Sequence, residues 1–128
     1  MKNLKLLSGL LLLFSVSLII QSCGDDNEVD YKMDNQAFVN QASSSNNFEI
    51  AAGTLAQTKG QRDLVKQYGQ HMVTDHSTVG AEMAGLANRK GWTIPAPTDL
   101  QPKEQAMLKT LDSVTNETFD LQFAAIMI

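Results

Sequence analysis

The sequence predicts an all-α fold: an up-down bundle with two long helices, one short helix and the start of a last one. Proline occurs only as Pro95, Pro97 and Pro102, so the two long segments before this stretch contain no proline to break a helix. The strict alternation of apolar and polar residues that is typical of strands is missing, and apolar residues recur at spacings of three and four. Ala, Gln, Leu and Met, which favour helices, are frequent.

The first long helix is predicted from about residue 35 to residue 59. Asp34 is a suitable N-cap, and Gly60 marks the end. The polar run Ser43–Asn47 contains weak helix formers, so a break there is an alternative, but one continuous helix is the prediction. Its apolar or small positions recur at spacings of three and four: Phe38, Ala42, Ser45, Phe48, Ala52, Leu55 and Ala56.

The second long helix is predicted from about residue 61 to residue 90, ended by Gly91, with a length of about 45 Å. On a helical wheel, His76 lies in the middle of an apolar stripe, whereas His71 lies about 140° away. The two histidines therefore cannot serve one site. His71 and Asp75, one turn apart, are predicted to form an exposed pair. The stripe around His76 consists of Val65, Gly69, Met72, Val73, Val79, Gly80, Met83 and Ala87.

An imidazole inside an apolar stripe needs a hydrogen-bonding partner, because an unsatisfied buried polar group costs about 1 to 3 kcal/mol. Glu49 on the first helix is the candidate, since antiparallel packing across Gly60 would bring it close to His76. Two interpretations remain. Glu49 and His76 form a buried structural pair, or they bind a metal together with Asp75, which would require three or more ligands.

A short helix is predicted from Pro102, which suits the first helical position, to about residue 115. Asn116 is the predicted N-cap of a last helix that carries Phe119 and Phe123. Its twelve residues would reach only about 18 Å and leave part of the apolar stripe uncovered. We therefore expect either a truncated chain, which the apolar last residues favour, or self-association through the uncovered helix face.

Residues 1–22 predict an export signal, in which Lys2 and Lys5 precede an apolar run from Leu6 to Ile20. The run has about 15 residues and falls short of the roughly 20 that span a bilayer, so a membrane-spanning anchor is the weaker alternative. Loss of the signal would leave eight basic and 14 acidic residues, a net charge of −6. Such a chain is not expected to bind nucleic acid.

Cys23, the only cysteine, directly follows this signal, and Ile20-Gln21-Ser22-Cys23 resembles a bacterial lipobox, in which the cysteine is lipidated. The alternative is a free thiol without a disulfide partner. Residues 23–33 are polar and acidic and predict a solvated tether. Gly24 stands where an aspartate would favour the inner membrane, so we expect a lipoprotein, acylated for instance with palmitate, anchored at the outer membrane. The sequence leaves open whether it faces the periplasm or the cell surface.

Residues 34–128 provide for one modest core and one domain. The segment contains no glycine-rich phosphate loop, no cysteine spacing for zinc and no nucleophile elbow. No enzymatic activity and no cofactor are therefore predicted, apart from the alternative of a metal at Glu49 and His76.

Several short motifs in this domain resemble DUF4142, a domain family of unknown function. The resemblance implies a ferritin-like helical bundle in the cell envelope, with Glu49, Asp75 and His76 at positions that mark the family. It implies no established activity. Ferritin-like di-iron sites use a Glu-x-x-His motif, and this chain has none. The resemblance also implies a longer last helix with a further histidine. The motifs are Phe38-Val39, Phe48-Glu49-Ile50 with Gly53 and Leu55-Ala56, Met72-Val73-Thr74-Asp75-His76, Leu86-Ala87 with Lys90-Gly91 and Pro95, Leu111, and Phe119-Asp120.

Overall fold

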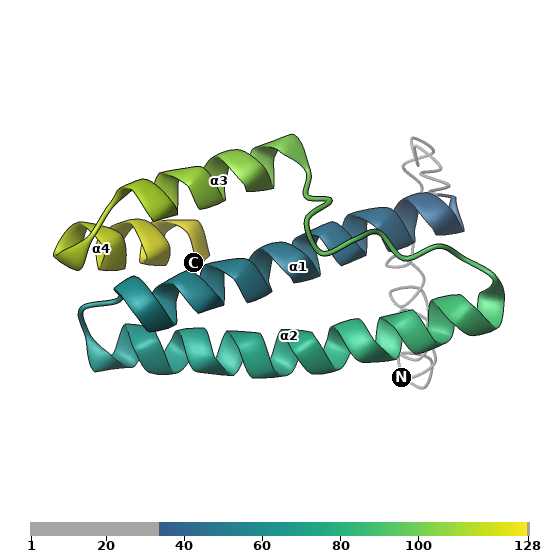
Figure 1. Cartoon of the computed structure of the whole chain (residues 1–128), viewed down its shortest axis with the longest axis horizontal. Helices are drawn as coiled ribbons and strands as arrows, with labels where there is room; N and C mark the ends of the chain where they lie inside the picture. Colours follow the sequence, from purple (N-terminus) through teal and green to yellow (C-terminus); the bar gives the residue numbers. More distant parts are fainter. Residues whose placement is uncertain (1–33, 128) are drawn as a thin grey trace, which may run out of the picture. The chain divides into compact units, whose positions relative to one another are not determined.

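The computed structural model describes residues 34–127, which form four α-helices and contain no strand (Figure 1). In chain order the helices are α1 (Asn35–Lys59), α2 (Asp63–Lys90), α3 (Pro102–Ser113) and α4 (Asn116–Met127). The predicted all-α fold is thus confirmed. The predicted signal, Cys23 and the tether lie outside the described residues.

The first helix, α1, is continuous, and the weak helix formers of Ser43–Asn47 do not interrupt it. Asp34 makes no side-chain cap hydrogen bond, although its carbonyl accepts the Phe38 N–H at 2.9 Å. At the other end, the Gly60 N–H donates to the Ala56 carbonyl at 3.0 Å. Tertiary partners of the polar run, described below, compensate for its low helix propensity.

The two long helices, α1 and α2, lie antiparallel along most of their lengths (Figure 1). They are in close contact at two glycines. A Cβ atom built on Gly69 would lie 2.6 Å from the Gly53 carbonyl oxygen and 2.7 Å from the Ala56 Cβ. A Cβ on Gly53 would lie 2.8 Å from the Gly69 carbonyl oxygen. The two backbones are therefore in direct contact, which no larger residue at these positions permits.

The second helix, α2, begins at Asp63, two residues later than predicted. Arg62 is extended, because the backbone N–H groups of Gln61 and Arg62 bond to a carboxylate of α4. The helix ends at Gly91 as predicted, in the left-handed conformation (φ 71°). The Trp92 N–H then donates to the Ala87 carbonyl at 2.9 Å, a Schellman-type ending.

The connection from α2 to α3 returns along α1 (Figure 1). The Gln36 side chain fastens it, since its Nε2 donates to the Thr93 carbonyl at 2.8 Å and its Oε1 accepts the Thr93 N–H at 2.9 Å. The short helix α3 then starts at Pro102, as predicted. A capping box of Gln101 and Glu104 stabilises this start.

Two boundaries at the α3–α4 junction differ from the predictions. The third helix ends at Ser113, two residues early, because Val114 is already extended. Asn116 is the first residue of α4 rather than its cap, and its backbone has a positive φ of 55°. Asparagine tolerates this conformation better than most residues, which allows the tight turn between the antiparallel helices α3 and α4.

The hydrophobic core lies where α3 and α4 cover the C-terminal half of α1 and the start of α2. Phe119 and Phe123 stack with ring centroids 5.8 Å apart, and Tyr68 meets Phe123 edge-on at 6.0 Å. None of the four helices in this described part is long and apolar enough to cross a membrane. The buried cluster consists of Phe48, Ala52, Ala56, Met72, Leu111, Phe119 and Phe123.

Two large apolar residues predicted for the packed stripes are instead exposed. Phe38 on α1 is 60 % exposed and Val79 on α2 is 51 % exposed. Both were assigned from helical periodicity, which identifies a face but not whether another element lies over it. Within the described residues, α4 is 12 residues long and lies along only about half of the 25-residue α1.

Candidate functional site

The structure brings Glu49 and His76 together. Glu49 Oε2 lies 2.6 Å from His76 Nε2, and Asn46 Oδ1 lies 3.2 Å from His76 Nδ1. Glu49 and Asn46 are three residues apart on α1, so both point at the same place on α2. Sequence reasoning identified Glu49 as the partner of His76 but missed Asn46.

Both nitrogens of the His76 ring are therefore engaged by α1. A neutral imidazole carries one N–H and can donate to only one of the two facing oxygens. Whether the Asn46 amide turns its oxygen or its NH₂ group toward His76 therefore depends on which ring nitrogen carries the proton. Gly80 makes room for this amide, because a Cβ at Gly80 would lie 2.9 Å from Asn46 Nδ2.

The pair is less buried than the sequence predicted. The side chain of His76 is 29 % exposed and that of Glu49 is 38 % exposed. The structure places His76 at partial exposure rather than in a fully buried site. A contact between polar side chains so open to solvent contributes at most about 1 kcal/mol.

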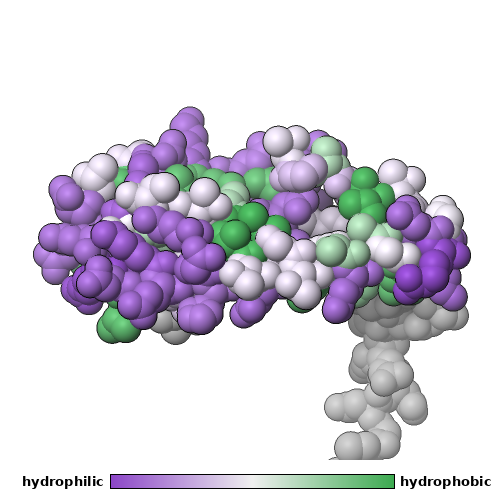
Figure 2. All heavy atoms as spheres, turned by 60° about the horizontal axis from the view of Figure 1, so that its bottom comes forward, coloured by the Kyte–Doolittle hydropathy of each residue, from purple (hydrophilic) through white to green (hydrophobic). Residues whose placement is uncertain are grey.

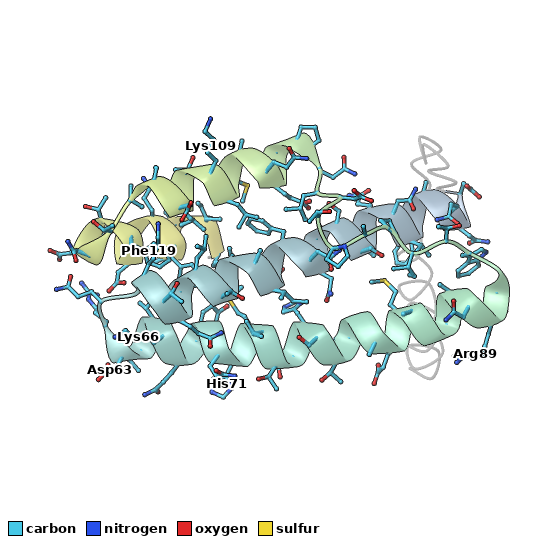
Figure 3. The ribbon with its side chains drawn as sticks, in the orientation of Figure 1. Asp63, Lys66, His71, Arg89, Lys109 and Phe119 are labelled. Carbon is cyan, nitrogen blue, oxygen red and sulfur yellow. The ribbon has the colours of Figure 1, made fainter. Side chains whose placement is uncertain are left out.

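Asp75 does not join Glu49 and His76. It is exposed on α2, as is His71, and Figure 3 shows His71 on the side of α2 that points away from α1. Among residues 34–127, no three His, Cys, Asp or Glu side chains lie close enough together to hold a metal ion. The described chain thus offers two of the three expected ligands at one place.

The polar run Ser43–Asn47 forms a second group of contacts that sequence reasoning missed. Ser44 Oγ donates to Glu104 Oε2 and accepts the Gln101 N–H at 2.8 Å. Ser45 Oγ donates to Glu104 Oε1 at 3.0 Å. On other sides of α1, Ser43 bonds to Met83 Sδ at 3.8 Å and Asn47 to the Ala96 carbonyl at 3.5 Å. The run therefore joins α1 to α2, to α3 and to the connection between them.

Asp120 holds the start of α2. Its carboxylate accepts the Gln61 N–H at 2.9 Å and the Arg62 N–H at 3.0 Å, and Arg62 Nε lies 3.8 Å away. The residue is only 3 % exposed. A negative charge at a helix N-terminus also interacts favourably with the helix dipole. Sequence reasoning noted Asp120 as part of a motif without assigning it this role.

The fold and its polar contacts define a class: an all-α bundle whose buried polar side chains join helices to one another. The family described as "Domain of unknown function (DUF4142)" matches residues 24–128. The chain belongs to this family, which confirms the predicted resemblance. No curated protein and no solved structure matches the chain.

Proposed function

We propose that this chain is a lipid-anchored helical domain of the bacterial cell envelope, placed at the outer membrane, with a non-enzymatic binding role. The anchor is supported by the position of Cys23, the only cysteine, directly after a short apolar run and before an acidic tether. Acyl chains contribute about 0.8 kcal/mol per buried methylene, and bacterial lipoproteins carry more than one chain.

The observation that carries the binding role is a part of α1 that is exposed among the described residues. Phe38, Gln41, Ala42 and Ser45 line a hollow of about 280 Å³, which we call the open trough. None of the four carries a charge, and Phe38 is 60 % exposed. Figure 2 shows hydrophobic residues at the surface in the middle and toward one end of the face it presents. Exposed apolar patches on a small domain mark contact surfaces.

Labelling with an alkyne analogue of palmitate in a Gram-negative host tests the anchor. We expect the wild-type protein to be labelled and to sediment with membranes until detergent is added, because the acyl chains hold it in the bilayer. The substitution Cys23→Ser should abolish both the labelling and the sedimentation with membranes. As a control, Cys23→Ser combined with Thr58→Cys keeps one thiol at an exposed position. Label on either variant, or none on the wild-type protein, would refute the proposed anchor.

A second candidate function is metal binding through Glu49 and His76, with Asp75 as a third ligand. The observation that favours it is the partly exposed nitrogen and oxygen pair of these two residues. A cation would have to displace the proton between them, recruit Asp75 by a rotation of its side chain, and take further ligands from water.

Titration of residues 24–128 with Zn²⁺ and with Fe²⁺, followed by calorimetry, separates the two candidates. We expect no one-to-one binding, because the ring nitrogens of His76 are already satisfied by Glu49 and Asn46. One-to-one binding that disappears in His76→Gln and persists in His71→Gln would establish the metal function instead. His71 is a suitable control because it lies on the same helix and is exposed.

A further inference from the structure

A polar hollow lies where the connection between α2 and α3 passes along α1 and enters α3 (Figure 1). Its volume is about 510 Å³, within the roughly 300 to 1,000 Å³ of small-molecule sites. It opens on another side of α1 than the open trough, because the side chains of Asn40 and Phe38 point about 160° apart on a helical wheel. Five of the residues that line this hollow, which we call the amide hollow, are polar: Asn40, Thr98, Asp99, Gln101 and Gln105.

Hydrogen bonds hold the wall of the amide hollow in one shape. In addition to the two bonds from Gln36 to the connection, the Asp99 side chain accepts the Ala96 N–H at 3.1 Å. The Asp99 N–H in turn donates to the Ala96 carbonyl at 2.9 Å. Gln105 Nε2 donates to the Leu100 carbonyl at 2.8 Å, which ties the connection to α3. A wall held in this way is preorganised, so a ligand loses less affinity to the ordering of loops.

The same bonds orient the polar side chains and use only one end of each. Gln105 is held by its Nε2 and keeps Oε1 for a ligand, and Asp99 is held by Oδ2 and keeps Oδ1. Asn40 Oδ1 accepts Gln36 Nε2 at 2.8 Å, so its NH₂ group is the end that remains. Within residues 34–127, the amide hollow therefore offers one oriented donor and two oriented acceptors.

We propose that the amide hollow binds a neutral oligosaccharide through Asn40, Asp99 and Gln105. Sugar hydroxyl groups donate and accept at once, so they can bond to a donor and to acceptors that lie on one wall. Among the described residues that line the hollow, Asp99 alone is charged, which disfavours anionic ligands. Pro95 and Leu100 complete the lining and can contact the apolar C–H face of a sugar ring. The site is separate from the open trough and goes beyond the binding role proposed for it.

Nuclear magnetic resonance of ¹⁵N-labelled residues 24–128 tests the proposal, since residues 33–128 form a compact unit of their own. The probes are cellobiose, maltose and N,N′-diacetylchitobiose, each added to roughly 10 mM, because we expect a dissociation constant on the order of 1 mM. At least one probe should shift the signals of residues 95–101 and of the Asn40 NH₂ group saturably. No saturable shift with any of the three, or shifts centred on the open trough, would overturn the proposal.

Two substitutions remove polar groups from the amide hollow and nearly keep the size of the side chain. Asn40→Leu and Gln105→Met should each raise the dissociation constant about fivefold, because each removes one hydrogen bond to the sugar. Asn88→Leu and Gln70→Met make the same exchanges at exposed positions on α2 and should leave the dissociation constant unchanged. Equal effects of the two pairs would overturn the proposal. The palmitate labelling of Cys23 tests the proposed anchor separately.

Discussion

Replacing Gly69 by alanine is expected to lower the free energy of unfolding by about 2 to 3 kcal/mol, the upper part of the range of about 1 to 3 kcal/mol typical of overpacked cores. The new methyl group would lie 2.6 Å from the Gly53 carbonyl oxygen and 2.7 Å from the Ala56 Cβ. Neither atom can move by a side-chain rotation, so α1 and α2 must separate. Urea unfolding measures the loss, and thermal unfolding should show a midpoint lower by roughly 10 °C or more.

Gly85→Ala is the matched control, since it makes the same substitution in the same helix. The nearest atom to a Cβ at Gly85 is Arg89 Nη1 at 3.6 Å, which is an ordinary contact at the end of a mobile side chain. This variant should gain about 0.5 to 1 kcal/mol from the higher helix propensity of alanine. Equal effects of the two substitutions would show that the glycine contact between the helices is not tight.

Asp120→Asn is expected to lower the free energy of unfolding by about 1.5 to 3 kcal/mol, the range for hydrogen bonds to a charged group. Asparagine has nearly the same shape as aspartate, but its NH₂ group would face one of the two backbone N–H groups of Gln61 and Arg62. One buried donor would then lack an acceptor. Urea unfolding measures the change.

Asp112→Asn provides the comparison for a carboxylate at the surface. Asp112 pairs with Lys59 at 2.7 Å, but its side chain is 68 % exposed. Loss of this ion pair should change the free energy of unfolding by less than about 1 kcal/mol. If Asp120→Asn proves as mild as Asp112→Asn, the role of Asp120 in holding the start of α2 is refuted.

Local signals predicted most of the fold. Gly91 and Pro102 mark helix boundaries because their backbone requirements are properties of single residues. Gly60 also marks the end of α1, although its φ of −55° is one that any residue adopts. The contact between Glu49 and His76 could also be inferred, since a short link forces two long helices to pack antiparallel and the helical wheel then fixes which residues face each other.

The remaining features depend on contacts between residues far apart in the sequence. The bonds of Asp120 to Gln61 and Arg62 cross nearly 60 positions, and nothing near Asp120 indicates them. Likewise, the exposure of Phe38 depends on which elements lie over it and not on its neighbours in the sequence. For the contacts of Ser43–Asn47, in contrast, the sequence does contain an indication. Five consecutive polar residues in a helix with an apolar stripe indicate partners on more than one side.

The contacts of Ser43–Asn47 restrict the ways in which α1 can align with its neighbouring helices. Apart from the contact between Gly53 and Gly69, small apolar residues such as Ala52 and Ala56 would tolerate α1 sliding along its neighbours by one turn, about 5.4 Å. Such a slide would separate Asn46 from His76 and Ser44 from Glu104, and would leave several polar groups without partners at about 1 to 3 kcal/mol each. A segment that weakens α1 in isolation therefore selects a single register in the folded domain.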